Sequence, residues 1–111
     1  SLASSHQKVS LEEMQKYSSL VGGYAMKQHC KVVSKHRKGD FDLSLQTIRI
    51  YFKSKGMSPE AIKKLTEDSK KVAQTPPFSS CNDKTKTIIG NTFFAAFDWA
   101  VKIANQSKNK D

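Results

Sequence analysis

The stretch TIIGNTFFAAFDWAVKIAN, residues 87–105, decides the fold of this 111-residue chain. At about 100° per residue, its apolar side chains cover far more than the single stripe of an ordinary surface helix. One broad face holds Ile88, Ile89, Phe93, Ala96, Trp99, Ala100 and Ile103. The adjoining flank holds Gly90, Phe94, Phe97 and Val101, which leaves Asn91, Asp98 and Lys102 on a narrow polar edge.

A helix that is apolar over so much of its circumference has to be covered on more than one side. Two arrangements satisfy this requirement. Either the helix is the central one of a bundle, or Phe94 and Val101 face a second chain or another target. We expect Asp98 to lie on an exposed edge and Trp99 to lie in the core.

Helix signals also precede this stretch. Ser10 and Glu13 form a capping box, which predicts a long first helix from Leu11 to Ser34. The paired glycines Gly22-Gly23 within it allow another backbone to approach closely.

Two further helices are expected in the middle of the chain. After the polar break HRKGDFD, residues 36–42, we expect a helix over 43–55 that is capped by Asp40 or Asp42. Ser58 and Pro59 then predict the start of a third helix, with an apolar stripe of Ile62, Leu65 and Val72. The last helix is expected from Asn82 or Asp83 to about Gln106.

These signals predict an all-α fold: a single four-helix domain over residues 1–111, with flexible ends at 1–9 and 107–111. A chain of this length supports one modest core. No stretch approaches the ~20 apolar residues that a membrane span needs.

Cys30 and Cys81 are the two cysteines of the chain, and neither belongs to a CxxC motif. They allow three interpretations: an intramolecular disulfide, two buried free thiols, or a reactive Cys30 beside His29. On a helix, adjacent side chains point about 100° apart, so His29 does not face Cys30. We predict the disulfide, which ties the end of the first helix to the start of the last helix and contributes about 4 kcal/mol.

The net charge of +9 permits negatively charged partners such as nucleic acid, cell-wall polymer or acidic proteins. Lys27, Lys31 and Lys35 recur at i+4, and Arg37 and Lys38 extend this basic stripe into the following loop. A solvated helix face and a surface for an acidic partner both fit this stripe. The chain has only two arginines, Arg37 and Arg49. Specific recognition of phosphates and bases favours arginine over lysine, so this composition argues against nucleic-acid binding.

Motifs for catalysis are missing from the sequence: it contains no glycine-rich phosphate loop, no GxSxG and no HExxH. We therefore predict a protein that is not an enzyme, with no cofactor and no metal. The expected function is a small periplasmic or secreted binding protein, such as an inhibitor, an immunity-type protector, an adaptor or a chaperone. Its export signal would have been removed from this chain.

The expected partner is another protein, of acidic character, and a homodimer is an alternative. The candidate partner-binding residues are Lys27, Lys31, Lys35, Arg37, Lys38, Phe94, Phe97 and Val101. The second hypothesis for function is a cytosolic basic helical module that binds nucleic acid. That hypothesis requires free thiols and a continuous basic surface.

Overall fold

The computed structural model describes residues 8–32 and 38–109. Within them the chain forms four helices and no strand: α2 (Leu11–Cys30), α3 (Lys38–Ser54), α4 (Pro59–Ala73) and α5 (Asp83–Asn109). Cys30 and Cys81 are joined by a disulfide with a Cα–Cα distance of 5.5 Å. The prediction of a four-helix fold with one bridge between the first and last helices is confirmed.

Helix α2 begins as predicted and ends earlier than predicted. The Ser10 side chain accepts from the Glu13 amide, and the Glu13 carboxylate accepts from the Ser10 amide, both at 3.0 Å. Lys31 then adopts a left-handed conformation, with φ of 53°, and its amide donates to the Lys27 carbonyl. The helix therefore stops at Cys30, and the predicted extension to Ser34 is wrong as far as residues 31 and 32 are described.

Helix α3 begins five residues earlier than expected, so neither Asp40 nor Asp42 caps it. The reason is Phe41, which lies within the otherwise polar segment 36–42. Phe41, Leu45, Ile48 and Phe52 recur at helical spacing and are all at most 2% exposed. Because a helical turn at Phe41 buries its ring beside Leu45, Ile48 and Phe52, the helix extends toward its N-terminus.

The start of α4 and the start of α5 are as predicted. The Ser58 side chain accepts from the Ala61 amide at 3.1 Å, and Pro59 occupies the first turn. Gly56, which lies between the end of α3 and the start of α4, adopts a left-handed conformation with φ of 93°. At α5, the Asn82 side chain accepts from the Thr85 amide at 3.1 Å, which makes Asn82 the capping residue.

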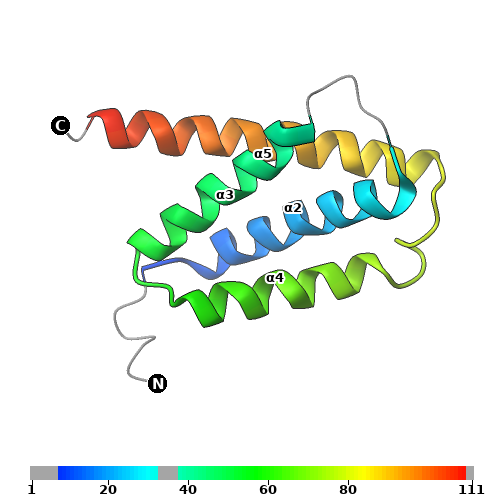
Figure 1. The fold of residues 1–111 in the computed structure, drawn as a ribbon, viewed down its shortest axis with the longest axis horizontal. Coiled ribbons are helices and arrows are strands. Elements are labelled where there is room, and N and C mark those ends of the chain that lie inside the picture. The colour runs from blue at the N-terminus through cyan, green and yellow to red at the C-terminus, as the bar shows by residue number, and fades with distance from the viewer. Residues whose placement is uncertain (1–7, 33–37, 110–111) are drawn as a thin grey trace.

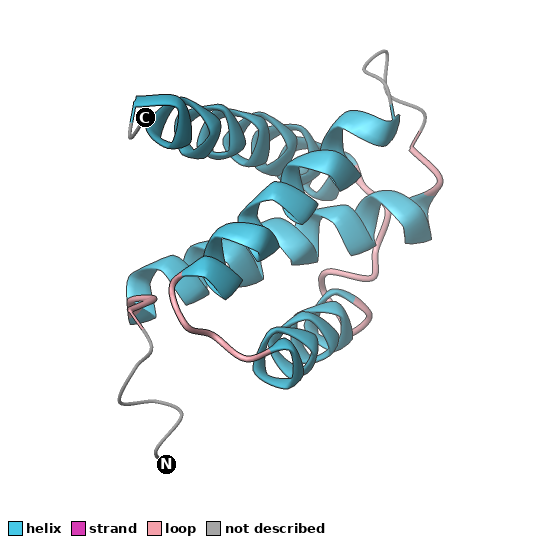
Figure 2. Cartoon of the chain, turned by 60° about the vertical axis from the view of Figure 1, so that its left-hand side comes forward, coloured by secondary structure: helices cyan, strands magenta, loops and turns pink. Residues whose placement is uncertain are grey.

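Helix α2 is the central helix of the bundle. It lies between α4 and α5 in both views of the chain, and α3 crosses it (Figure 1, Figure 2). Among the described residues, α2 packs against all three other helices, whereas α4 and α5 do not pack against each other. The alternative in which α5 is the central helix is therefore wrong.

The core nevertheless uses the broad face of α5 as predicted. Ile89, Phe93, Ala96, Trp99, Ala100 and Ile103 are all at most 9% exposed. Aromatic rings connect the helices, since Phe52 packs edge-on against Tyr17 at 5.3 Å and against Trp99 at 5.9 Å between ring centroids. Val9 also belongs to this core, and the Lys8 amide donates to the Lys55 carbonyl at 2.7 Å. Lys8 and Val9, expected in a flexible end, thus have specific contacts.

At Gly23, helix α2 packs closely against Thr92 of α5. A methyl group at this position would overlap the Thr92 side chain, whereas one at Gly22 would meet no atom within 4 Å. The predicted role of the glycine pair is therefore confirmed for Gly23 alone. Gly22 lies on an open part of the α2 surface.

The Glu13 carboxylate links the start of α2 to α3, because the Tyr51 hydroxyl donates to it at 2.7 Å. Burial raises the pKa of Glu13, but hydrogen bonds from Ser10 and Tyr51 and the nearby charge of Lys55 outweigh it, so the pKa lies below its ordinary value of 4.5. As the pH falls, the Glu13 carboxylate takes up its proton at a higher pH in the unfolded state than in the folded state. The stability that ionised Glu13 gives the fold is therefore present above about pH 4.5 and is lost as the pH falls through the folded-state pKa.

We therefore expect Glu13→Gln to reduce the loss of stability between about pH 6 and about pH 3, because the variant has no carboxylate to protonate there. Urea unfolding at the two pH values measures this difference. Glu12→Gln is the control, since Glu12 is exposed in the same helical turn. A Glu13→Gln variant as acid-sensitive as the wild type would contradict the expectation.

Candidate functional site

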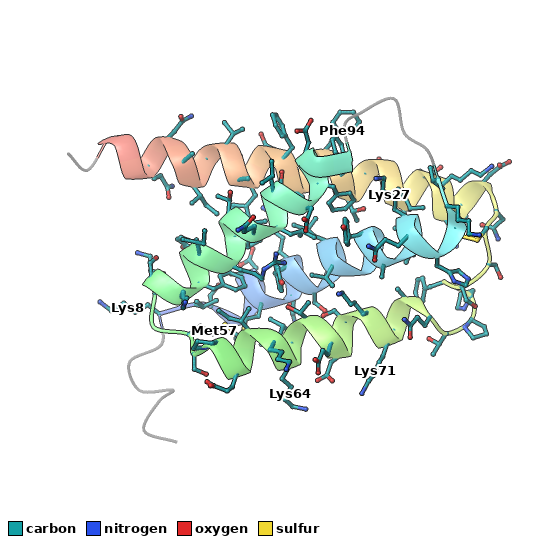
Figure 3. The ribbon with its side chains drawn as sticks, in the orientation of Figure 1. Lys8, Lys27, Met57, Lys64, Lys71 and Phe94 are labelled. Atoms are coloured by element: carbon teal, nitrogen blue, oxygen red, sulfur yellow. A yellow bond between two sulfur atoms is a disulfide. The ribbon has the colours of Figure 1, made fainter. Side chains whose placement is uncertain are left out.

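Large apolar side chains are exposed where α3 and α5 lie side by side. They are Leu43 (59% exposed), Phe94 (59%), Phe97 (49%) and Val101 (42%), and we call them the α3–α5 face. Phe94, Phe97 and Val101 recur along one edge of α5, and Phe94 projects away from α2 (Figure 3). A shallow groove of about 240 Å³ runs beside Leu43, Phe97 and Val101. The flank of α5 that carries Phe94, Phe97 and Val101 is therefore partly exposed to solvent, and the expectation that it faces a second chain or target stays a prediction.

The predicted lysine stripe does not form a continuous exposed surface. Lys27 is only 8% exposed and lies on the side of α2 that faces α5, one turn after Gly23 (Figure 3). Lys31 is exposed but stands in the left-handed turn that ends the helix. Lys35 and Arg37 lie outside the described residues, as does the side chain of Lys38.

A second surface feature, which we call the basic cleft, lies between α3 and α4. These helices meet where residues 55–58 join them and then diverge (Figure 1). The cleft has a volume of about 480 Å³, and its floor is formed by Val21 and Tyr24 of α2. Four cationic side chains line it, two from each wall: Arg49, Lys53, Lys63 and Lys70.

Hydrogen bonds at the floor of the basic cleft connect all three helices. The Thr66 hydroxyl donates its proton to the Ile62 carbonyl at 2.8 Å. The Tyr17 hydroxyl, 2.7 Å from Thr66 Oγ1, must therefore be the donor to Thr66. Tyr17 in turn accepts from Arg49 Nη1 at 3.4 Å. The guanidinium of Arg49 is thus held at the floor through a hydroxyl group that is itself fully buried.

The electrostatics of the basic cleft favour an anion. Asp42 is the one carboxylate among its lining residues, against the four cations. Burial and the Asp42 charge raise the pKa of Tyr24, while the Arg49 charge lowers it. The Tyr24 hydroxyl therefore keeps its proton at neutral pH and remains a hydrogen-bond donor.

A third depression, which we call the neutral groove, separates α4 from α5. It has a volume of about 410 Å³, and no ionisable side chain lines it. Its floor is the open surface of α2 around Ser18, Ser19 and Gly22. Val72 of α4, predicted as part of a buried stripe, lies on its edge and is 58% exposed. The buried stripe of α4 runs instead through Ile62, Ser69 and Ala73.

The described residues contain no group of three or more metal-ligating side chains. In the same part of the chain, no helix combines the length and apolar character that a membrane crossing requires. Both cysteines are bridged, so the free thiols needed by the nucleic-acid hypothesis are absent. Asp98 lies on an exposed edge as expected, 3.1 Å from Lys102 Nζ.

No family model, curated protein or solved structure matches this chain.

The sequence predicts the α5 part of the α3–α5 face, Phe94, Phe97 and Val101, but neither Leu43 nor the basic cleft. Lys63, Lys64, Lys70 and Lys71 all fall outside the apolar stripe predicted for the third helix, so the sequence does not distinguish among them. In the structure Lys64 and Lys71 point away from the bundle (Figure 3), whereas Lys63 and Lys70 line the cleft. The i, i+4 pair Arg49 and Lys53 was the available signal for a basic wall on α3.

Proposed function

We propose that this chain is a small binding protein that recognises another protein through the α3–α5 face and performs no catalysis. The exposure of Leu43, Phe94, Phe97 and Val101, from 42% to 59%, is the observation that carries this proposal. Contiguous exposed apolar side chains on a folded domain mark interaction sites. Aromatic anchors such as Phe94 and Phe97 are the residues that commonly dominate binding energy at such sites.

An acidic protein is the partner that the charge of the chain favours. Two copies of a chain with a net charge of +9 repel each other, whereas a negatively charged protein is attracted and associates faster at low salt. A partner with an apolar pocket surrounded by acidic side chains would complement both the α3–α5 face and the positive charge of the chain. Inhibitors, immunity-type protectors, adaptors and chaperones act through surfaces of this kind.

The Cys30–Cys81 bridge supports a periplasmic or secreted location for this function. Disulfides persist in oxidising compartments and are rare where glutathione and thioredoxin keep thiols reduced. The same bridge argues against a cytosolic nucleic-acid module.

We expect Phe94→Asp to keep the fold and to weaken partner binding at least about 30-fold, since loss of an interface anchor costs 2 kcal/mol or more. The partner is isolated by cross-linking capture, purified, and titrated against both proteins by calorimetry. Leu11→Asp is the matched control, because Leu11 is 67% exposed and lies away from the α3–α5 face. Circular dichroism of each variant checks that it is folded.

Three results would overturn the proposal. The first is a purified partner that binds Phe94→Asp as tightly as the wild type. The second is wild-type self-association in sedimentation that Phe94→Asp abolishes, which would identify a homodimer. The third is an affinity that does not fall with added salt, which would exclude an acidic partner.

A further inference from the structure

The basic cleft is closed at one end, which limits what it can accommodate. Lys53 and Pro59 line it where the turn 55–58 joins α3 to α4, whereas Asp42 and Lys70 line it where the helices have diverged. Its volume of about 480 Å³ falls within the roughly 300–1,000 Å³ of small-molecule sites. A peptide helix needs a groove that is open at both ends or much larger, so the shape favours a single flexible chain that enters from the open end.

Positive charge concentrates toward the closed end. Arg49, Lys53 and Lys63 lie there, whereas Asp42 lies at the open end. Arg49 has five N–H donors, and the Tyr17 hydroxyl occupies one of them. The remaining donors form the planar fork that matches a carboxylate, and the anchored geometry lowers the entropy lost when such a group binds.

Apolar surface continues from Arg49 toward the open end. Val21 and Leu45 lie beneath the floor there and are at most 2% exposed, so the partly buried ring of Tyr24 supplies its apolar surface. Ile50, 61% exposed, stands on the rim of the α3 wall. The cleft therefore combines a fixed cationic site with an adjoining apolar strip, the pattern that recognises a molecule with a charged head and a hydrocarbon chain.

We infer that the basic cleft binds a single-chain amphiphile with a carboxylate head, of the fatty acid class. The carboxylate pairs with the guanidinium of Arg49 and with Lys53 and Lys63. The hydrocarbon chain lies over the ring of Tyr24 and beside Ile50. This site is separate from the α3–α5 face, so its test does not depend on the function proposed for that face.

Dodecanoate below its micellar concentration is the probe, titrated into the full chain by calorimetry at low salt. We expect saturable binding at one site per chain. Arg49→Gln is expected to weaken it about 10- to 100-fold, because a charge-assisted pair is lost. Lys71→Gln is the matched control, since it removes the same charge from the outer face of α4 (Figure 3) and is expected to leave the affinity unchanged. Dodecanol, with the same chain and no charge, is expected to bind at least about tenfold more weakly.

Thermal unfolding of each variant establishes that it is folded. If Arg49→Gln does not fold, Ile50→Asp replaces it, because this exposed position places a negative charge on the rim without disturbing the core. The inference is overturned if dodecanoate does not saturate, or if neither cleft variant weakens it. It is equally overturned if dodecanol binds as well, or if only vesicles of an anionic phospholipid bind, which would indicate attraction to a membrane surface.

Discussion

Replacing Cys81 with serine is expected to lower the free energy of unfolding by about 4 kcal/mol. The bridge closes a loop between residues separated by 51 positions, and it restricts the unfolded chain far more than the folded one. Cys81 is exposed and Cys30 is only partly buried, so the substitution leaves no large cavity that would account for the loss. Chemical denaturation of the two proteins without reductant measures the difference.

The double variant Cys30→Ser/Cys81→Ser separates the bridge from the side chains. If the bridge is the cause, the double variant is no less stable than either single variant, because the same covalent link is missing in all three. Reductant should then lower the stability of the wild type to the same level and leave Cys81→Ser unchanged. Additive losses in the double variant would show that the cysteine side chains, and not the bridge, carry the stabilisation.

Replacing Gly23 with alanine is expected to lower the free energy of unfolding by roughly 2–3 kcal/mol, as overpacking of a close contact does. The new methyl group would overlap the Oγ1, Cβ and Cγ2 atoms of Thr92. No rotamer change moves the Thr92 Cβ, so α2 and α5 have to separate. Gly22→Ala is the matched control, with the same substitution one residue earlier in the same helix. It meets no atom within 4 Å and is expected to raise stability by about 0.5–1 kcal/mol.

Transferring the glycine to the other helix tests the mechanism of this loss. Thr92→Gly alone removes the overlapping atoms at the cost of about 1 kcal/mol in helix propensity. The double variant Gly23→Ala/Thr92→Gly should therefore be more stable than Gly23→Ala alone. If the two losses simply add, the loss in Gly23→Ala does not arise from contact with Thr92.

Helix positions could be predicted from the sequence where local chemistry determines them. The capping groups Ser10, Ser58 and Asn82 satisfy backbone amides within three residues, so their effect is visible without tertiary structure. Helix ends that depend on distant packing were misplaced. Phe41 extends α3 because a core is available to bury it, and Lys31 ends α2 without the glycine that usually marks such a turn.

Candidate surfaces were predictable only where one helix carries the signal. The exposed flank of α5 follows from the excess of apolar residues on that helix, and Phe94, Phe97 and Val101 are indeed exposed. The basic cleft depends on how far α3 and α4 diverge, and the hydrophobic periodicity of the sequence gives no information about that divergence. The i+4 spacing of Lys27, Lys31 and Lys35 suggested a common exposed face, but the packing of α2 against α5 buries Lys27.

Helix α4 forms one wall of the basic cleft and one wall of the neutral groove. It rests on α2 through a seam of hydroxyl groups, in which Ser18 lies 2.6 Å from Ser69 and Tyr17 lies 2.7 Å from Thr66. Because α4 is a wall of both spaces, a displacement of α4 that widens the basic cleft narrows the neutral groove. The hydroxyl contacts that fix α4 on α2 therefore set the widths of both spaces together.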